Sequence, residues 1–394
     1  MLMLLLPKSG KSKRRKVKGK VNISGDYMSN TEDLVSRHIK GIAPYEPIVP
    51  PEELARRFGI PSEKIIKLNG NENLYGCSPR AKKALADYSQ YHIYPDPEQR
   101  KLREALSKYI GIDMENIMVG SGSDDYIDLV LRLFVEADDE VISCPPTFGM
   151  YPFSTAVCGG RLVEINRHED FTLDIAAIKQ AINKRTKVIF LASPNNPSGN
   201  TAPREEILEL LKEGKILVVD EAYQEFSSGA SAIDLILRYD NLIVLRTFSK
   251  WAGLAGLRVG YALCPVRIAQ YFMRIKQPYN VNVAAEVAAL ASLADLTYLK
   301  STIAAIIQER GRLSDKLKKN SFLKVYPSEA NFILCAVLNG KAKDIYQNLQ
   351  RKGIFIRYYN NPLLKDYIRI SIGKPEHTDV IITALEEMAN AGGW

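Results

Sequence analysis

The sequence is poor in the two residue types that most often bind metals or form covalent cross-links. Its 394 residues include five cysteines and four histidines. The cysteines are scattered, odd in number and form no C-x-x-C pair, so neither a disulfide framework nor a zinc site is indicated. The histidines show no ligand spacing either. We therefore expect no metal and a reducing, cytoplasmic environment.

Long apolar runs are also absent. A membrane-spanning helix needs about 18 or more apolar residues, and no segment approaches that length. The opening segment Met1–Leu6 is apolar but short, and it precedes the nearby basic residues instead of following them. That order argues against a secretory signal. No membrane partner is expected.

Acidic residues are missing from the first 20 positions, which carry eight lysines and arginines. The formal net charge of the whole chain is +8, so this segment accounts for the entire basic excess. A basic arm can bind polyanions such as nucleic acid. We favour a disordered basic tail over residues 1–28, or a translation start upstream of the true one at Met28. Nucleic acid is therefore an unlikely partner.

What is present indicates a large α/β protein. The chain is 46% hydrophobic and 25% charged, which is typical of a globular protein, and its length predicts two or three domains. From about residue 97, helical segments alternate with short strands that are apolar on both faces, a pattern that predicts a mainly parallel sheet covered on both sides. The expected helices are 98–109 and 124–135; the expected strands are 141–144, 187–192, 215–220, 241–245 and 259–263.

The pattern changes after Pro278, where long helices precede shorter strands. This order predicts a smaller α+β domain with a closing helix. Its expected helices are 282–292, 298–319 and 377–391, and its strands 331–337, 353–357 and 367–372. The proline-rich segment 43–51 predicts an extended arm, because proline fixes the backbone and donates no hydrogen bond. The expected division is an arm at 29–75 that partly joins the small domain, a large domain at 76–285 and a small domain at 286–394.

Chemically distinctive residues follow the predicted strands of the large domain. Asn196 lies in the loop after strand 187–192, Asp220 ends the next strand with Tyr223 close behind, and Lys250 follows strand 241–245. Ligands of an open parallel sheet bind beyond the carboxyl ends of its strands. We therefore expect these four side chains to converge on one crevice.

Such a set suits carbanion chemistry on an amino acid, for which pyridoxal 5'-phosphate (PLP) is the usual electron sink. Lys250 would hold PLP as a Schiff base, and an ionised Asp220 would keep the pyridine nitrogen protonated. Asn196 and Tyr223 would donate hydrogen bonds to the phenolate oxygen of the ring and lower the pKa of the Schiff base. Lys250, Asp220 and Tyr223 are thus the candidate catalytic residues.

A phosphate cradle is predicted from the segment Gly120–Asp125. Its small residues directly precede a helix, and the free N–H groups at a helix N-terminus bind phosphate. Ser249 and Arg258 would complete the cradle, because a guanidinium makes charge-assisted contacts with phosphate oxygens.

These motifs resemble those of the fold-type I PLP enzymes, and most closely the histidinol-phosphate aminotransferase family. The resemblance extends from about residue 33 to the end of the chain. It includes four further motifs in the family's order: Lys67–Asn73, Tyr94–Pro97, Cys144–Tyr151 and Asp366–Gly373. It implies a mainly parallel seven-stranded sheet in a large domain, beside a smaller α+β domain.

The resemblance assigns further cofactor contacts. It implies that Lys250 also shuttles a proton between the substrate Cα and the C4' atom of the cofactor, and that the backbone at Ser123 and Asp124 holds the phosphate. Phe148 stands where a tyrosine usually stacks on the ring. Tyr75 resembles the tyrosine that reaches the cofactor phosphate of a neighbouring subunit, although Leu74 departs from the usual proline before it.

The family's substrate residues match Tyr45 in the arm and Arg357 and Arg369 in the small domain. Paired arginines suit a site that must accept the phosphate of histidinol phosphate and the carboxylates of glutamate or 2-oxoglutarate. The resemblance implies a homodimer that catalyses this transamination by a ping-pong mechanism.

Three alternatives remain open at this point. A threonine-phosphate decarboxylase has a similar architecture and also binds a phosphorylated amino compound. An aromatic-amino-acid aminotransferase would use the same site. In a different class, the protein would be a non-catalytic nucleic-acid binder that uses its basic tail.

Overall fold

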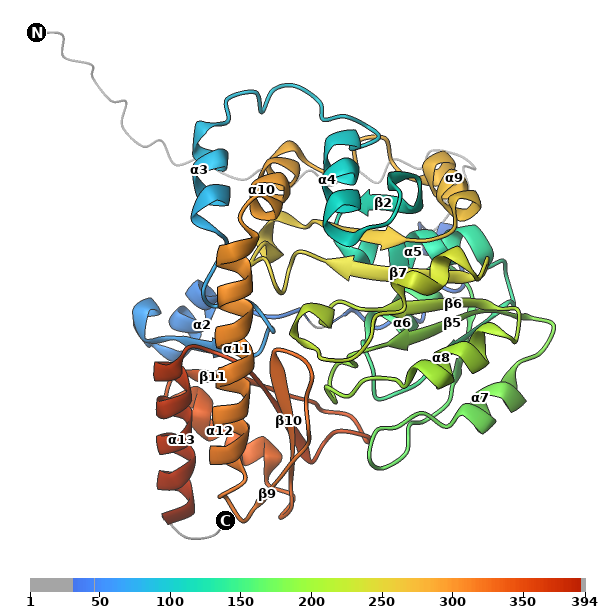
Figure 1. Ribbon diagram of the computed structural model, residues 1–394. Coiled ribbons are helices and arrows are strands. Elements are labelled where there is room, and N and C mark those ends of the chain that lie inside the picture. The colour runs from blue at the N-terminus through green and yellow to red at the C-terminus, as the bar shows by residue number, and fades with distance from the viewer. Residues whose placement is uncertain (1–30, 46, 391–394) are drawn as a thin grey trace, which may run out of the picture.

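A computed structural model describes residues 31–45 and 47–390 (Figure 1). The basic tail expected at residues 1–28 lies outside the described residues, as does position 391 at the end of the predicted closing helix.

The larger sheet has seven strands in the order β2-β8-β7-β6-β5-β3-β4. All neighbouring pairs from β7 to β4 are parallel, whereas β8 is antiparallel to both β2 and β7. This arrangement confirms the predicted fold class. The strands are β2 (Ile117–Gly120), β3 (Glu140–Ser143), β4 (Arg161–Glu164), β5 (Thr186–Ala192), β6 (Ile216–Asp220), β7 (Leu242–Thr247) and β8 (Gly260–Leu263).

Helices cover both faces of this sheet because its central strands are apolar on both sides. Leu217 and Val219 of β6 belong to one buried cluster, while Val218 between them belongs to another. The first cluster includes residues of α3 (Pro79–Asp87), α4 (Arg100–Ile110), α7 (Ile175–Ala181), α8 (Arg204–Leu211) and α10 (Val283–Leu293). The second includes residues of α5 (Ser123–Phe134), α6 (Met150–Val157) and α9 (Val266–Ile275).

The smaller sheet has five strands in the order β1-β11-β12-β10-β9. Only β1 and β11 pair in parallel. The strands are β1 (Ile66–Leu68), β9 (Leu323–Val325), β10 (Phe332–Val337), β11 (Ile354–Tyr358) and β12 (Tyr367–Ser371). The remaining helices are α1 (Thr31–Leu34), α2 (Pro51–Phe58), α11 (Leu296–Leu317), α12 (Ala342–Arg351) and α13 (Pro375–Asn390). Helix α11 runs from the larger to the smaller sheet (Figure 1).

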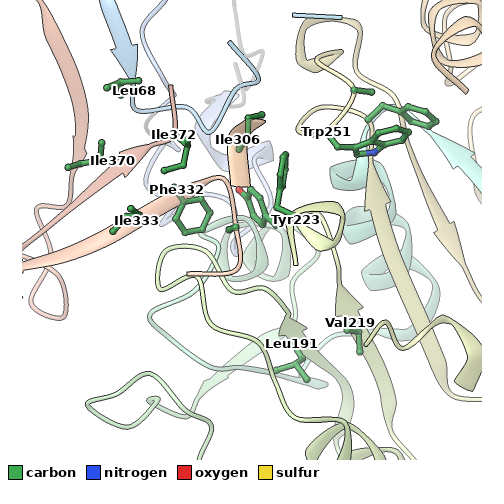
Figure 2. Close-up of a cluster of buried hydrophobic side chains, with 14 of the residues drawn as sticks. Leu68, Leu191, Val219, Tyr223, Trp251, Ile306, Phe332, Ile333, Ile370 and Ile372 are labelled. Atoms are coloured by element: carbon green, nitrogen blue, oxygen red, sulfur yellow. The ribbon is translucent and has the colours of Figure 1, made fainter. Parts of the chain in front are cut away.

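A single apolar cluster extends across both sheets. Tyr223, which follows β6, packs edge-on against Phe332 of β10, with 5.1 Å between the ring centroids. Figure 2 shows both rings, with Leu191 and Val219 of the larger sheet and Ile370 of the smaller one. The two sheets are therefore held against each other directly beside the predicted crevice.

Eight strands and five helices expected from the sequence are present, with ends shifted by at most two residues. Strands β1, β2, β4 and β9 were not predicted. They have only three or four residues each, and β4 is partly exposed at the edge of its sheet, so they carry little periodic signal. Strand β1 lies in the expected arm and pairs with β11. The domain limits given above stay a prediction.

No single helix in the described part of the chain is long and apolar enough to cross a membrane. Helices α10 and α11 have the length and apolar composition of a membrane span only when they are taken together, and the two are bent by 84° relative to each other. Both contribute side chains to the buried cluster, among them Ala288, Leu299 and Ile306.

Candidate active site

A cavity of about 670 Å³ lies at the carboxyl ends of β5, β6 and β7 and is closed on one side by the smaller sheet. Twelve of the thirteen predicted site residues line it. They are Tyr45, Ser123, Asp124, Phe148, Asn196, Asp220, Tyr223, Ser249, Lys250, Arg258, Arg357 and Arg369. The structure thus brings together residues that are more than 300 positions apart in the chain.

Lys250 reaches the cavity from the loop after β7. Its Nζ donates a hydrogen bond to the carbonyl oxygen of Gly70 (3.3 Å) and lies 5.9 Å from the ring centre of Tyr223. Burial, assisted by the positive charge of Arg369, lowers the pKa of Lys250 to about 8. More of this amine than of an exposed lysine is therefore neutral and nucleophilic close to neutral pH.

This shift predicts that the reactivity of Lys250 levels off at a lower pH than that of exposed lysines. A lowered pKa makes the neutral amine available at lower pH, so in the apoprotein the rate of reductive methylation of Lys250 should rise about tenfold per pH unit and level off near pH 8. Ordinary lysines keep gaining reactivity up to about pH 10.4. Peptide mass spectrometry after brief treatment with formaldehyde and cyanoborohydride measures both in one sample. A Lys250 rate that follows the exposed lysines beyond pH 9 would contradict this prediction.

Asp220 ends β6 and is buried. Its Oδ2 accepts a hydrogen bond from the hydroxyl of Tyr151 (2.7 Å), and its Oδ1 accepts one from the backbone N–H of Ala222 (3.1 Å). Burial raises the pKa of Asp220 to about 6, while these two bonds act in the opposite direction. A buried carboxylate of this kind is stabilised by a cationic partner, and a protonated pyridine nitrogen would be one.

Tyr151 is a site residue that sequence reasoning missed. It is fully buried on α6, and its ring stacks on Phe190 of β5 with 4.7 Å between centroids. The available signal was the motif Cys144–Tyr151, which contains both Tyr151 and the predicted site residue Phe148.

The segment predicted to cradle a phosphate lies at the N-terminus of a helix. Helix α5 begins at Ser123, and Gly122 before it has φ 83°. A Cβ atom at Gly122 would lie 2.5 Å from Nη2 of Arg258, so only glycine lets the guanidinium come this close. Arg258 pairs with the carboxylate of Asp124 (2.6 Å), and the hydroxyl of Ser249 lies 2.9 Å from that of Thr247. The helix N-terminus and the guanidinium lie side by side, so these residues fit a phosphate group.

Asn196 and Tyr223 are oriented by residues from elsewhere in the fold. Arg369 of β12 donates to Oδ1 of Asn196, which leaves the Nδ2 group of that amide as the donor. The hydroxyl of Tyr223 accepts a hydrogen bond from Nδ2 of Asn71 (3.0 Å), so its own proton is directed elsewhere. Asn71 was also missed, although it lies in the motif Lys67–Asn73. Both predicted donors thus have a free N–H or O–H for a ring oxygen.

The three predicted substrate residues line the same cavity. Arg357 and Arg369 are directly paired across β11 and β12. Arg369 also donates to the carbonyl oxygen of Asn69 (2.8 Å). Tyr45 packs edge-on against Phe153 and is 45% exposed, so it lies at the mouth of the cavity.

Tyr75 does not line the cavity. Its carbonyl oxygen accepts a hydrogen bond from the hydroxyl of Tyr298 (3.4 Å), and its ring lies 5.8 Å from Nζ of Lys374. Because the expected partner of Tyr75 is the cofactor of a second subunit, its role stays a prediction.

The fold and this set of residues define a PLP-dependent transferase of fold type I. Residues 63–385 match the family described as aminotransferase class I and II. Two proteins named histidinol-phosphate aminotransferase are similar over most of the chain. That of Dehalococcoides mccartyi strain BAV1 is 50% identical, over 83% of this chain and 91% of the relative. That of Roseiflexus castenholzii is 49% identical, over 90% of this chain and 98% of the relative.

A solved structure gives the same result. The histidinol-phosphate aminotransferase of Sinorhizobium meliloti, crystallised with pyridoxal-5'-phosphate, superposes with a TM-score of 0.83 at 30% identity and covers 91% of this chain and 98% of its own. The present chain belongs to the histidinol-phosphate aminotransferases of this family.

Proposed function

We propose that this protein transfers the amino group of histidinol phosphate to 2-oxoglutarate, yielding imidazole acetol phosphate and glutamate in histidine biosynthesis. The observation that carries this proposal is that one cavity is lined by Lys250 and Asp220 and by two arginines, Arg357 and Arg369, that lie opposite each other on neighbouring strands. A lysine with a lowered pKa and an anion-binding pair are what the two half-reactions require.

Bound PLP supplies an electron sink for the bonds at the substrate Cα. Asp220, held by Tyr151, keeps a proton on the pyridine nitrogen. Asn196 and Tyr223 donate hydrogen bonds to the ring oxygen. The backbone N–H groups at Ser123 and Asp124 and the side chains of Ser249 and Arg258 would hold its phosphate.

Lys250 moves the proton in each half-reaction. Its Nζ would hold the cofactor covalently when no substrate is bound, and once free it would take and return the proton at the substrate Cα. Phe148, which lines the cavity, would stack on the cofactor ring, and Tyr45 lies at the mouth of the cavity. The second half-reaction reverses these transfers with 2-oxoglutarate as the amine acceptor.

The proposal also includes the oligomeric state of the protein and its location in the cell. We infer a homodimer in which Tyr75 reaches the neighbouring site, as the resemblance to the family implies; Tyr75 does not line the cavity of its own chain. We infer a reducing, cytoplasmic location, because all five cysteines are free.

The test is an absorption titration of the purified holoenzyme. Histidinol phosphate alone should bleach the yellow colour of the lysine-bound cofactor in one stoichiometric turnover, and 2-oxoglutarate should restore it. The released compound should be the keto product imidazole acetol phosphate. Release of carbon dioxide from threonine phosphate without a keto acid would favour a decarboxylase. A much higher kcat/KM with phenylalanine than with histidinol phosphate would favour an aromatic aminotransferase.

A further inference from the structure

Tyr359 lies directly after β11 and lines the active-site cavity beside Arg357 and Arg369. Its hydroxyl oxygen is buried and makes no hydrogen bond to any residue in the described part of the chain. Nearly all buried polar groups in proteins have a partner, so one that lies in a cavity wall indicates a ligand that supplies it.

A second buried group without a partner lies in the same wall. The Nε atom of Arg369 makes no hydrogen bond within the described residues, although the other two nitrogens of this guanidinium donate to Asn196 and to the Asn69 carbonyl. Arg357, paired with Arg369 across the strands, has its guanidinium carbon 5.5 Å from the ring centre of Tyr359. One O–H and two guanidiniums therefore face the same part of the cavity.

The phenol of Tyr359 is protonated at neutral pH. Burial raises its pKa, while the positive charges of Arg369 and Arg357 act in the opposite direction, and the hydroxyls of Tyr223 and Tyr45 add to the rise. A neutral phenol donates a hydrogen bond, and its natural partner between two guanidiniums is an anion.

We propose that Tyr359 is a specificity-determining residue for the amino donor, whose hydroxyl donates to the phosphate of histidinol phosphate. The inference rests on the proposed function and deepens it by assigning a third donor to the anion held by Arg357 and Arg369. Neither the sequence motifs nor the paired arginines had pointed to this residue.

The two substrates, glutamate and histidinol phosphate, carry their anionic groups at different distances from Cα. The α-carboxylate of glutamate is bonded directly to Cα, whereas the phosphorus of histidinol phosphate follows a methylene carbon and an oxygen and carries three terminal oxygens. Two nitrogens of Arg369 already donate hydrogen bonds within the protein, and this residue binds the nearer anion, the carboxylate. The farther and larger anion needs additional donors, which Arg357 and the hydroxyl of Tyr359 supply. Tyr359 should therefore matter more for the phosphate than for the carboxylate.

The experiment compares Tyr359→Phe with Tyr358→Phe as the matched control. Tyr358 loses the same atom, but it stacks on Tyr346 and does not line the cavity. For each holoenzyme, kcat and KM are measured with histidinol phosphate, with histidinol and with glutamate. A hydrogen bond to a charged group predicts that Tyr359→Phe raises KM for histidinol phosphate about tenfold or more and leaves kcat within about twofold. KM for histidinol and for glutamate should change less than about threefold.

The comparison of histidinol phosphate with histidinol isolates the contact between the hydroxyl and the phosphate, as a double-mutant cycle does. Tyr359→Gln, which restores a donor without the ring, should recover part of the loss and also keeps the test open if Tyr359→Phe does not fold. An equal rise of KM for all three amino donors, or no rise for histidinol phosphate, would overturn the inference. If the wild-type enzyme does not use histidinol phosphate, the proposed function fails instead.

Discussion

Lys250→Ala is expected to lower kcat for transamination by at least about 10,000-fold while the protein still binds PLP. The variant loses both the covalent attachment and the group that moves the proton at Cα, and loss of a general base alone costs about 100- to 10,000-fold. The cofactor should remain because Asp220, Arg258 and the N-terminus of α5 do not depend on the lysine. Single-turnover kinetics and an absorption spectrum after gel filtration measure the two effects separately.

Lys83→Ala is the control for this substitution, because Lys83 is 77% exposed on α3 and pairs only with Asp87 at the surface. Added methylamine should restore part of the activity of Lys250→Ala, since a small free amine can occupy the vacated space and carry the proton. Activity within tenfold of wild type, without any added amine, would mean that another residue is the base.

Asp220→Asn is expected to lower kcat by about 1,000-fold. The amide has the size of the carboxylate but no charge to hold the proton on the pyridine nitrogen, so the electron sink is lost; removal of one electrostatic stabiliser from an active site typically costs 100- to 1,000-fold. Tyr151→Phe removes only one of the two hydrogen bonds to this carboxylate, and about a tenfold loss is expected. Asp220→Asn therefore measures the effect of the charge of Asp220, and Tyr151→Phe measures the effect of its positioning.

The readout for this pair includes the spectrum of the bound cofactor as a function of pH. Asp220→Asn should shift the pH at which the yellow form appears, because the protonation of the ring changes. Asp234→Asn, at the surface where Asp234 pairs with Arg204, should leave spectrum and rate unchanged. A normal rate in Asp220→Asn would remove Asp220 from the proposed mechanism.

The meeting of the candidate site residues at the carboxyl ends of the strands could be predicted because it follows a general rule. Asp220 and Lys250 each end or follow an apolar run, and parallel strands that end at one edge bring such residues together. Five strands of the large domain were equally visible, since runs such as 188–192 are apolar throughout. At these strands, the apolar pattern of the sequence and the rule that ligands bind at the carboxyl ends of parallel strands gave the same prediction.

The supporting residues could not be predicted, because their partners are distant in the chain. Nothing near Tyr151 in the sequence indicates that its hydroxyl meets Asp220, 69 positions later. Asn71 contacts Tyr223 across 152 positions, and Tyr359 gains its significance only from the packing of β11 beside β12. Such contacts depend on how the smaller sheet is placed against the larger one, which short sequence patterns do not encode.

The apolar cluster that joins the two sheets lies beside the cavity. Binding of the cofactor there should therefore increase the free energy of unfolding of the protein. Tyr223 lines the cavity and packs against Phe332 of the smaller sheet, so the two sheets cannot separate without disrupting that wall of the cavity. A ligand that binds only the folded form stabilises it by about 2.7 kcal/mol at 100 times its dissociation constant. Cells short of vitamin B6 would then hold less folded enzyme as well as less active enzyme.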